Sequence, residues 1–296
     1  MEKLTILLTG GTGFIGKNIQ EKLADKYRIF APGHRELDLT NAEAVYNFLQ
    51  NNPVDVVINA AAVGVARNSK FDKSLISTNL RIFFNLVRAK NFYTRMIMLG
   101  SGAENDKTRP LIKVKEEEFD QRVPADEYGF YKYICAKYAE KSNFITHLRL
   151  FGVFGKYEDY ETRFISNIIC MALFDLPIKM KGNAKFAYLF VDDFIRILDR
   201  ILQNPPKDNI LNIASGNAVD LESIAKKVLA KLDKNLAISK ENDDMGKEYS
   251  ADISKQNEYL GQEFEFTPLE EALDNLINYY KSIIMTLNKD KFLIVN

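Results

Sequence analysis

A glycine-rich segment close to the N-terminus constrains the fold of this chain more than any other feature. The sequence TGGTGFIG, residues 9–16, follows an expected buried strand at Leu4–Leu8 and opens a helical pattern over Gly13–Ala24. Its regularly spaced glycines are Gly10, Gly13 and Gly16. Residues without a side chain allow a tight turn and a close approach of backbone to a ligand. The segment therefore predicts a strand–turn–helix unit whose helix N-terminus binds an anion.

The rest of the first half alternates short apolar runs with helical patterns. The expected strands are Tyr27–Ala31, Val54–Asn59, Arg95–Leu99 and Ile145–Phe151. The expected helices run from Thr40 or Asn41 to Gln50, from about Lys73 to Lys90, and from Asp126 to Ser142. This alternation is typical of an α/β fold with a Rossmann-type doubly wound parallel sheet. The charged stretch Ala103–Pro124 is expected to be a surface loop with little structure of its own.

The pattern becomes less regular after residue 155. We expect residues 1–155 to form a dinucleotide-binding Rossmann domain and residues 156–296 to form mainly a smaller α/β substrate-binding region. Helices are expected at Thr162–Phe174, Val191–Leu202 and Leu221–Leu232, and short strands near Ile178, Tyr188–Phe190, Ile210–Ile213 and Ala237. Thr267-Pro-Leu-Glu270 is a capping-box pattern, which predicts a helix from there to about Leu287.

Composition disfavours several classes of function. The 40 Lys and Arg residues balance 40 Asp and Glu residues, so no global field attracts nucleic acid or a membrane surface. The only cysteines, Cys135 and Cys170, lack the spacing of a metal site and suit a reducing compartment. The N-terminus has no apolar run long enough for a signal peptide or a membrane span. We therefore expect a cytoplasmic protein with a small-molecule partner and no metal.

The end of the second strand bears on which dinucleotide binds. An acidic residue there bonds the ribose 2′-hydroxyl of NAD, whereas an arginine suits a 2′-phosphate. The sequence IFAPGHR ends at Arg35 and contains no acid, which favours NADP(H) over NAD(H), although Arg35 can also be a solvated surface charge. Asp38 is placed to accept a hydrogen bond from adenine or to cap the next helix. The cofactor-binding residues predicted are Gly10, Thr12, Gly13, Phe14, Ile15, Gly16, Arg35, Asp38, Leu39, Ala60, Ala61, Ala62, Asn79 and Lys132.

A tyrosine and a lysine four residues apart carry the candidate chemistry. In the expected helix, Tyr128 and Lys132 lie on one face. An unperturbed phenol has a pKa of about 10, and a neighbouring cation lowers it towards working pH. Ser101 follows the fourth strand, where loops face the ligand crevice, and its hydroxyl can donate to a substrate carbonyl. A second pair with the same spacing, Tyr133 and Lys137, fits an ordinary amphipathic helix better.

Together these motifs resemble the extended short-chain dehydrogenase/reductase superfamily, the NAD-dependent epimerase/dehydratase family. TGGTGFIG, NAAA, LGS, YGFYK, RLFGVFG, YLFVDDF and FTPLEEALDNLINYY occur in the family's order. The resemblance implies that Ser101, Tyr128 and Lys132 form the catalytic triad and that Lys132 holds the nicotinamide ribose. It also implies that residues 187–214 return to the dinucleotide-binding domain.

Departures from the family pattern narrow the reaction. Dehydratases carry Asp-Glu where this chain has Gly102 and Ala103, with Glu104 one position late, so dehydration is disfavoured. The chain is most similar to GDP-fucose synthase and related 4-keto-sugar reductases, but it lacks the cysteine (Ala103) and the later histidine of their epimerisation step. His147 lies within a strand and fits a core histidine.

We therefore expect NADPH-dependent reduction of a 4-keto nucleotide sugar. An NAD-dependent nucleotide-sugar 4-epimerase and a non-catalytic dinucleotide sensor are the alternatives. The substrate-binding residues predicted are Ser101, Gly102, Ala103, Tyr128 and Arg163; Lys179 and Lys181 can also meet a diphosphate. The family pairs the helices at Lys73–Lys90 and Asp126–Ser142 into a four-helix dimer interface, which Phe83 and Phe84 would suit, although both also suit core packing.

Overall fold

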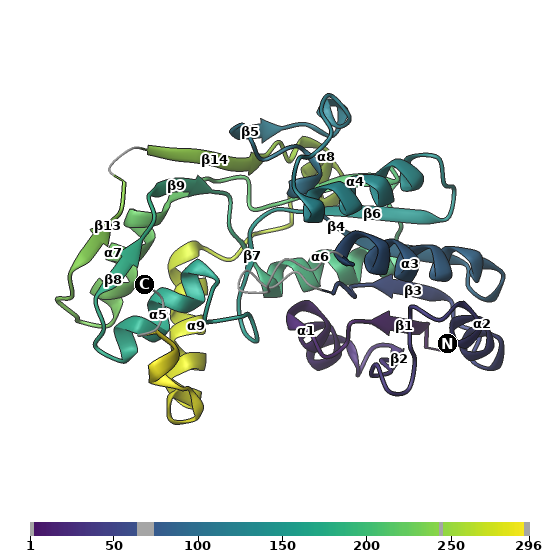
Figure 1. Ribbon diagram of the computed structural model, residues 1–296, viewed down its shortest axis with the longest axis horizontal. Coiled ribbons are helices and arrows are strands. Elements are labelled where there is room, and N and C mark those ends of the chain that lie inside the picture. The colour runs from purple at the N-terminus through teal and green to yellow at the C-terminus, as the bar shows by residue number, and fades with distance from the viewer. Residues whose placement is uncertain (1–2, 64–73, 243–244, 293–296) are drawn as a thin grey trace.

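A six-stranded parallel sheet forms the centre of the larger part of the molecule (Figure 1). The structure, a computed structural model, describes residues 3–63, 74–242 and 245–292. The strands lie in the order β11-β6-β4-β3-β1-β2, and all neighbouring pairs are parallel. Their bounds are β1 Thr5–Thr9, β2 Arg28–Phe30, β3 Val56–Asn59, β4 Arg95–Ser101, β6 Ile145–Leu150 and β11 Ile210–Ile213.

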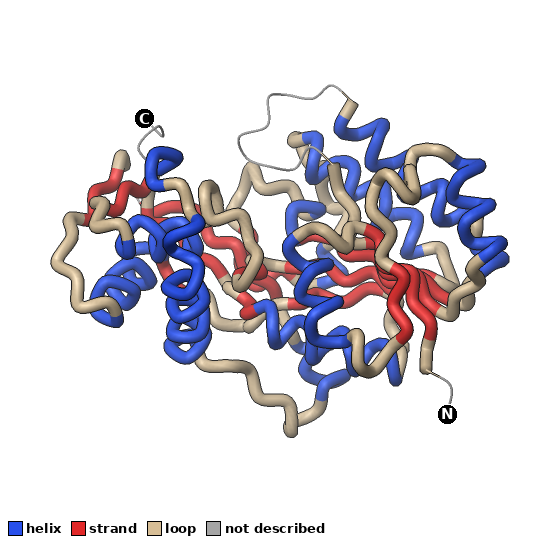
Figure 2. The backbone as a smooth tube through the Cα atoms, turned by 90° about the horizontal axis from the view of Figure 1, so that it is seen from below, coloured by secondary structure: helices blue, strands red, loops and turns tan. Residues whose placement is uncertain are grey.

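Helices cover both faces of this sheet (Figures 1 and 2). They are α1 Phe14–Leu23 and α6 Val191–Gln203 on one face, and α2 Ala42–Asn51, α3 Leu75–Arg88 and α4 Glu127–Glu140 on the other. Along β1, Ile6 and Leu8 pack with α1 and α6, while Leu7 packs with α2 and α3, because successive side chains of a strand point to opposite faces. The prediction of a doubly wound α/β fold is confirmed.

The strand order identifies where a ligand belongs. The chain moves from β1 to β2 at one side and then returns to place β3 on the other side of β1. At such a switch point the loops after the two strands separate, and ligands bind outside the carboxyl ends of the strands. In this chain those loops are the glycine turn after β1 and residues 60–63 after β3.

The C-terminal region forms a smaller, mixed unit with its own apolar core. Helices α5 Phe164–Leu173, α7 Leu221–Lys231 and α9 Leu269–Ile283 pack together there. The strand pairs are β7 Val153–Phe154 with β10 Leu189–Phe190, and β8 Ile178–Met180 with β13 Ile238–Lys240. A four-stranded sheet has the order β12-β9-β14-β5, with β12 Val219–Asp220, β9 Asn183–Phe186, β14 Met245–Ala251 and β5 Leu111–Val114. Helix α8, Ser254–Leu260, follows β14.

The segment between β4 and α4 differs from its expectation. Instead of an irregular loop, it contains the 3₁₀ turn η2 (Gly102–Glu104), strand β5 and the 3₁₀ turn η3 (Glu116–Glu118). Leu111 and Val114 are buried, and β5 pairs with β14, far along the chain. The strand is too short to show periodicity, and its partner lies in the C-terminal half, so local sequence gave no sign of it.

The capping-box prediction at Thr267 was wrong. Helix α9 begins at Leu269, after Pro268, without a side-chain cap. The Thr267 hydroxyl instead donates to Asp193 Oδ1 on α6 at 2.7 Å, which ties α9 to the larger part of the molecule. Further along, the last turn of α9 passes into η4 (Ile284–Thr286), and η5 covers Lys289–Phe292. Among the residues that the structure describes, no helix is both long and apolar enough to cross a membrane.

Candidate active site

The glycine turn between β1 and α1 is a cradle that side chains would fill. Gly10 has a φ of 70°, and a Cβ there would lie 2.8 Å from the backbone of Ala60 and Ala61. A Cβ at Gly16 would lie 2.2 Å from the Gly10 carbonyl oxygen. Both positions therefore require glycine, one for its conformation and the other for the packing of helix on turn.

Among the described residues, no side chain caps the N-terminus of α1. Gly13 precedes the helix, and Gly13 and Thr12 are exposed. Uncapped N–H groups and the helix dipole favour a phosphate. These residues, with Phe14 and Ile15 in the first turn, therefore fit the pyrophosphate of a dinucleotide.

The loop after β3 lies opposite this turn and is fixed by buried polar groups. Asn79 on α3 is almost fully buried, and its amide both donates to and accepts from the Val63 backbone at 2.9 Å. The Thr9 hydroxyl accepts from the Ala61 N–H at 3.3 Å. Asn79 thus holds Val63 and Thr9 holds Ala61, and a direct contact of Asn79 with cofactor stays a prediction.

The loop after β2 carries the residues predicted to read the adenosine end. Arg35 is exposed there, and Leu39 is partly buried against α2 and α3. Asp38 Oδ1 accepts hydrogen bonds from the Thr40 N–H and hydroxyl, which lower the pKa of its carboxyl. Of the two roles left open for Asp38, helix capping is excluded, because Asn41 caps α2.

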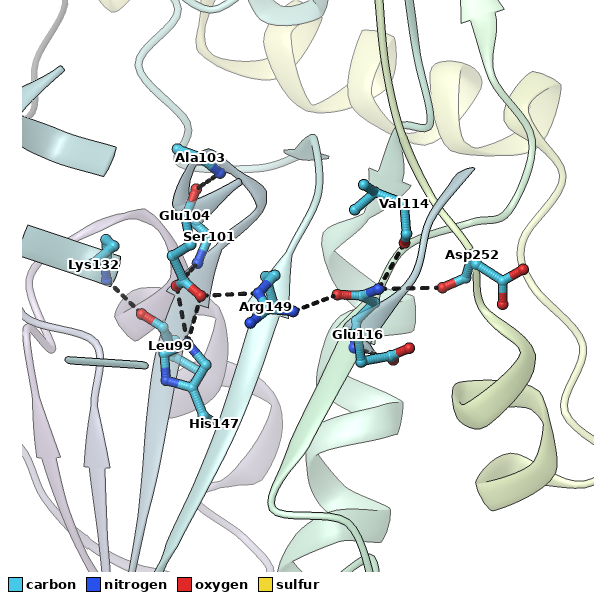
Figure 3. Close-up of polar contacts among 11 residues, drawn as sticks. Leu99, Ser101, Ala103, Glu104, Val114, Glu116, Lys132, His147, Arg149 and Asp252 are labelled. Carbon is cyan, nitrogen blue, oxygen red and sulfur yellow. Dashed lines mark hydrogen bonds and ion pairs between the residues drawn. The ribbon is translucent and has the colours of Figure 1, made fainter. Parts of the chain in front are cut away.

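Ser101 is the last residue of β4 and caps η2 (Figure 3). Its Oγ accepts a hydrogen bond from the Ala103 N–H at 3.2 Å, and its own N–H donates to Glu104 Oε1 at 2.7 Å. The hydroxyl keeps its hydrogen as a donor and a second lone pair as an acceptor. Ser101 and Ala103 are 9% and 2% exposed, so the turn borders the interior.

Helix α4 brings Tyr128 against this turn. Asp126 caps the helix by accepting from the Gly129 N–H at 2.9 Å. A Cβ at Gly129 would lie 2.6 Å from the Ala103 carbonyl oxygen, so glycine is what allows helix and turn to touch. Tyr128 itself is partly exposed, and its ring packs edge-on against the ring of buried Tyr131 at 5.5 Å.

Lys132 lies one turn further along α4 and is 5% exposed. Its Nζ donates to the Leu99 carbonyl oxygen on β4 at 2.5 Å, two residues before Ser101 (Figure 3). The structure therefore brings Lys132 close to Ser101 at the carboxyl end of β4 and packs the first turn of α4, which carries Tyr128, on the same turn. That the three side chains act as one triad stays a prediction. The second Tyr–Lys pair is separate: Tyr133 and Lys137 both bind the Asp120 carboxylate at the surface.

Tyr249 is a site residue that the sequence did not suggest. It comes from β14, and its hydroxyl is a hydrogen-bond partner of the Ser101 side chain. A Cβ at Gly102 would lie 2.5 Å from the Tyr249 Oη. Burial raises the pKa of Tyr249 well above its usual value, so it stays a neutral phenol. No local motif marks Tyr249, because only the pairing of β14 with β5 and β9 carries it to the turn.

Other candidate residues lie elsewhere. Arg163 precedes α5 and is exposed, as are Lys179 and Lys181. His147 is fully buried and bonds Glu104, as expected for a core histidine. The described part of the chain holds no cluster of three or more side chains able to bind a metal ion.

The comparisons with known proteins agree with this geometry. A profile described as the NAD dependent epimerase/dehydratase family matches residues 6–214. The chain is 24% identical over 263 residues to ADP-L-glycero-D-manno-heptose-6-epimerase from Brachyspira hyodysenteriae, across 75% of this chain and 79% of that protein.

Two solved structures share the fold. A GDP-L-fucose synthetase from Naegleria fowleri bound to NADP matches with a TM-score of 0.83 and 17% identity, over 98% of this chain and 96% of that one. The GDP-mannoheptose C4 reductase from Campylobacter jejuni with NADP bound matches with a TM-score of 0.79 and 20% identity, over 95% and 99%. The family profile covers more than half of the chain and contains the glycine turn, the Ser101 turn and α4. The chain therefore belongs to the NAD dependent epimerase/dehydratase family, and it is an NAD(P)-dependent enzyme that modifies nucleotide sugars.

Proposed function

We propose that this enzyme reduces the keto group of a nucleotide-activated 4-keto sugar with NADPH. The observation that carries the proposal is that Lys132 and the Ser101 turn meet at the carboxyl end of β4, with the first turn of α4, which carries Tyr128, packed on the same turn. There a carbonyl can be held by a hydroxyl and protonated by a phenol. Bound NADPH supplies the hydride.

The chain's own residues account for the remaining steps. The Ser101 hydroxyl, whose oxygen is held by the Ala103 N–H, donates to the substrate carbonyl. The Tyr128 phenol gives its proton to the carbonyl oxygen as the carbon receives hydride. Ketone, hydride and proton then make one alcohol, and NADP⁺ is released. Lys132, whose Nζ donates to the Leu99 carbonyl oxygen, would hold the nicotinamide ribose.

Elimination of water is not supported. The two positions after Ser101 are Gly102 and Ala103, neither of which can transfer a proton. Glu104 has no exposed surface and is bonded to His147 and Arg149. It is therefore unable to reach a substrate as an acid or a base.

The preference for NADPH rests on the loop after β2. Arg35 is exposed there, whereas the Glu36 carboxylate accepts from the Gly33 N–H at 2.7 Å and is held within the turn. An arginine free to form charge-assisted bonds suits a 2′-phosphate. Arg35→Met should raise the KM for NADPH about tenfold or more and leave the KM for NADH unchanged. An equal rise of the KM for NADPH and of the KM for NADH would contradict the proposal that Arg35 binds the 2′-phosphate.

Tyr128→Phe tests the role of the phenol. We expect turnover to fall by about 10²–10⁴-fold, while NADPH binding, followed by fluorescence titration, changes little. Tyr133→Phe is the matched control, because its phenol binds Asp120 at the surface of the same helix. A near-normal rate in the Tyr128 variant would disprove the proposed proton donor.

A substrate panel separates reduction from epimerisation, which the likeness to a heptose 6-epimerase keeps open. NADPH oxidation should be followed with 4-keto-6-deoxy sugars linked to GDP, CDP, dTDP and UDP. A reductase consumes NADPH stoichiometrically and exchanges free cofactor. Tightly retained NAD in the purified enzyme, with interconversion of unreduced sugars, would indicate the epimerase.

We also propose that α3 and α4 form a dimer interface with their copies in a second chain. The two helices pack side by side, and Phe83, Phe84 and Tyr138 form a cluster of rings across them. Tyr138 is 38% exposed at the outer side of this cluster. Sedimentation should show a dimer that Tyr138→Lys weakens; a monomer in the unaltered protein contradicts the proposal.

A further inference from the structure

A fully buried ion-pair cluster lies directly beneath the Ser101 turn (Figure 3). It consists of Glu104 from η2 and of His147 and Arg149 from β6, whose side chains are all 0% exposed. Glu104 Oε2 accepts from Arg149 Nε at 2.9 Å, and both carboxylate oxygens lie 2.9 Å from His147 Nε2. Buried charges are tolerated only when paired and hydrogen-bonded in this way.

The carboxylate of this cluster also holds the catalytic turn. Glu104 Oε1 accepts the Ser101 N–H at 2.7 Å, while the Ser101 Oγ accepts the Ala103 N–H. These reciprocal bonds form a capping box, which fixes both the backbone and the side chain of Ser101. The orientation of the Ser101 hydroxyl thus depends on where the Glu104 carboxylate is held.

Strand β4 is adapted to this arrangement. A Cβ at Gly100 would lie 2.2 Å from His147 Nε2 and 2.5 Å from Glu104 Oε1. The strand therefore passes over the cluster with no room for a side chain. A glycine at this position, just before Ser101, lets the carboxylate come directly under the turn.

The cluster is anchored further into the molecule. Arg149 Nη1 donates to Asn212 Oδ1 on β11 at 3.3 Å, and Asn212 Nδ2 donates to the Val114 carbonyl oxygen at 2.9 Å. The Arg149 guanidinium also lies over the Phe119 ring, 4.6 Å from its centre. Strands β6 and β11 and the segment between β4 and α4 therefore hold Arg149, and through it Glu104, in one place.

We propose that Glu104 is a positioning residue for Ser101, held in register by Arg149 and His147. This inference rests on the proposed function only in assigning the Ser101 hydroxyl to the substrate carbonyl. Glu104 touches no substrate. It sets the direction in which Ser101 donates its hydrogen bond, and so the alignment of the carbonyl with the Tyr128 proton. A small misplacement of such a group is enough to slow the reaction strongly.

A double-mutant cycle tests the proposal with NADPH and GDP-4-keto-6-deoxymannose, or with the best substrate of the panel. Glu104→Gln keeps the size of the side chain but removes the charge that holds Arg149. We expect kcat to fall about tenfold with the KM for NADPH within about twofold. In the Ser101→Ala background the same substitution should lower kcat less than about twofold, since the hydroxyl it aligns is gone. An equal loss in both backgrounds would show that Glu104 does not act through Ser101.

Two further variants guard the interpretation. Glu104→Asp keeps the charge but shortens the side chain, so we expect this variant to fold even if Glu104→Gln does not. It should then show the same difference in kcat between the two backgrounds. Glu118→Gln is the matched control, because Glu118 Oε1 closes the equivalent box on the Lys115 N–H at 3.0 Å in η3, outside the cluster of Glu104, His147 and Arg149. It should leave kcat unchanged.

A crystal structure of the Glu104→Asp variant gives a readout that needs no substrate. We expect the Ser101 Oγ to move by about 1 Å, the scale of misplacement that slows catalysis. An unmoved Oγ overturns the inference. An enzyme that reduces no 4-keto sugar overturns the proposed function instead, and the two failures are thus distinguishable.

Discussion

Two buried carboxyl groups, one in each half of the molecule, are held in opposite ways. Glu104 lies beneath the catalytic turn against His147 and Arg149. Although burial raises its pKa, these two neighbours lower it, and the net pKa is about 2. Glu158, before α5, is 8% exposed and bonded to the Ser166 hydroxyl at 2.8 Å. Burial raises its pKa to about 7, and the Ser166 bond only partly offsets this.

The difference teaches what burial does with and without a counter-charge. A carboxyl taken out of water becomes hard to ionise unless a cation is buried with it. Beneath Ser101 the cation is present, so the negative charge is permanent and fixes a backbone N–H. Near α5 the hydrogen-bond partner is a neutral hydroxyl and the cation Arg163 is exposed rather than buried with the carboxyl, so Glu158 titrates close to neutral pH. Only the first arrangement can hold a catalytic group in the same way at every working pH.

Removing the positive charge of Arg149 should have the largest effect on stability. Arg149→Met leaves the Glu104 carboxylate buried with one partner fewer, and we expect the free energy of unfolding to fall by about 3–5 kcal/mol. Urea denaturation measures the change. Lys137→Met is the control, because Lys137 pairs with Asp120 at the surface, where water screens the pair. Equal effects of the two substitutions would contradict the distinction between a cation buried with its carboxylate and one paired at the surface.

The second largest effect should be a loss of stability at acid pH, as the Glu104 carboxylate beside Arg149 and His147 is protonated. Because its pKa is lower in the folded protein than the usual 4.5, the pair contributes fully above about pH 4.5. That contribution, roughly 3 kcal/mol, is lost as the pH falls towards 2. Urea unfolding at a series of acidic pH values should show a steep loss in the unaltered protein and a shallower one in Glu104→Gln. Parallel curves would mean that Glu104 is not ionised in the fold.

Glu158 should respond in the opposite direction. Its pKa is raised in the folded protein, so its favourable contribution is complete below about pH 4.5 and is lost as the pH rises through 7. Between about pH 5 and about pH 8 the loss should be roughly 2 kcal/mol, and Glu158→Gln should abolish it. Unfolding of both proteins at the two pH values gives the comparison, with Glu161→Gln as a neighbouring control. A loss that persists in Glu158→Gln would place the titrating group elsewhere.

The contrast also explains what the sequence could predict. The glycine turn, the parallel sheet and the placement of Tyr128 and Lys132 on α4 depend on residues that are close in the chain. Gly10 and Gly16 make the turn predictable from the sequence, because only glycine fits at these two positions. Local spacing was therefore enough for the fold class and for the glycine turn.

The support of Ser101 was not predictable in the same way. Glu104 meets His147 and Arg149 only because β4 and β6 pair, and Tyr249 reaches the turn only because β14 pairs with β5 and β9. The sequence places Glu104 one position after the dehydratase acids, which suggested a missing function rather than a structural role. The burial of Glu104 and its two partners are visible only in three dimensions.

The smallest effect should come from the hydroxyl beside Glu158. Ser166→Ala removes the hydroxyl that donates to the Glu158 carboxylate and favours its charged form; the charge of Arg163 acts in the same direction but is the smaller effect. The pKa of Glu158 should therefore rise further, which widens its difference from the pKa of Glu104. Above neutral pH the free energy of unfolding should fall by about 1 kcal/mol. Infrared absorption of the protonated carboxyl, lost in Glu158→Gln, follows this titration directly. If the absorption disappears at the same pH in Ser166→Ala as in the unaltered protein, the bond from Ser166 does not lower the pKa of Glu158.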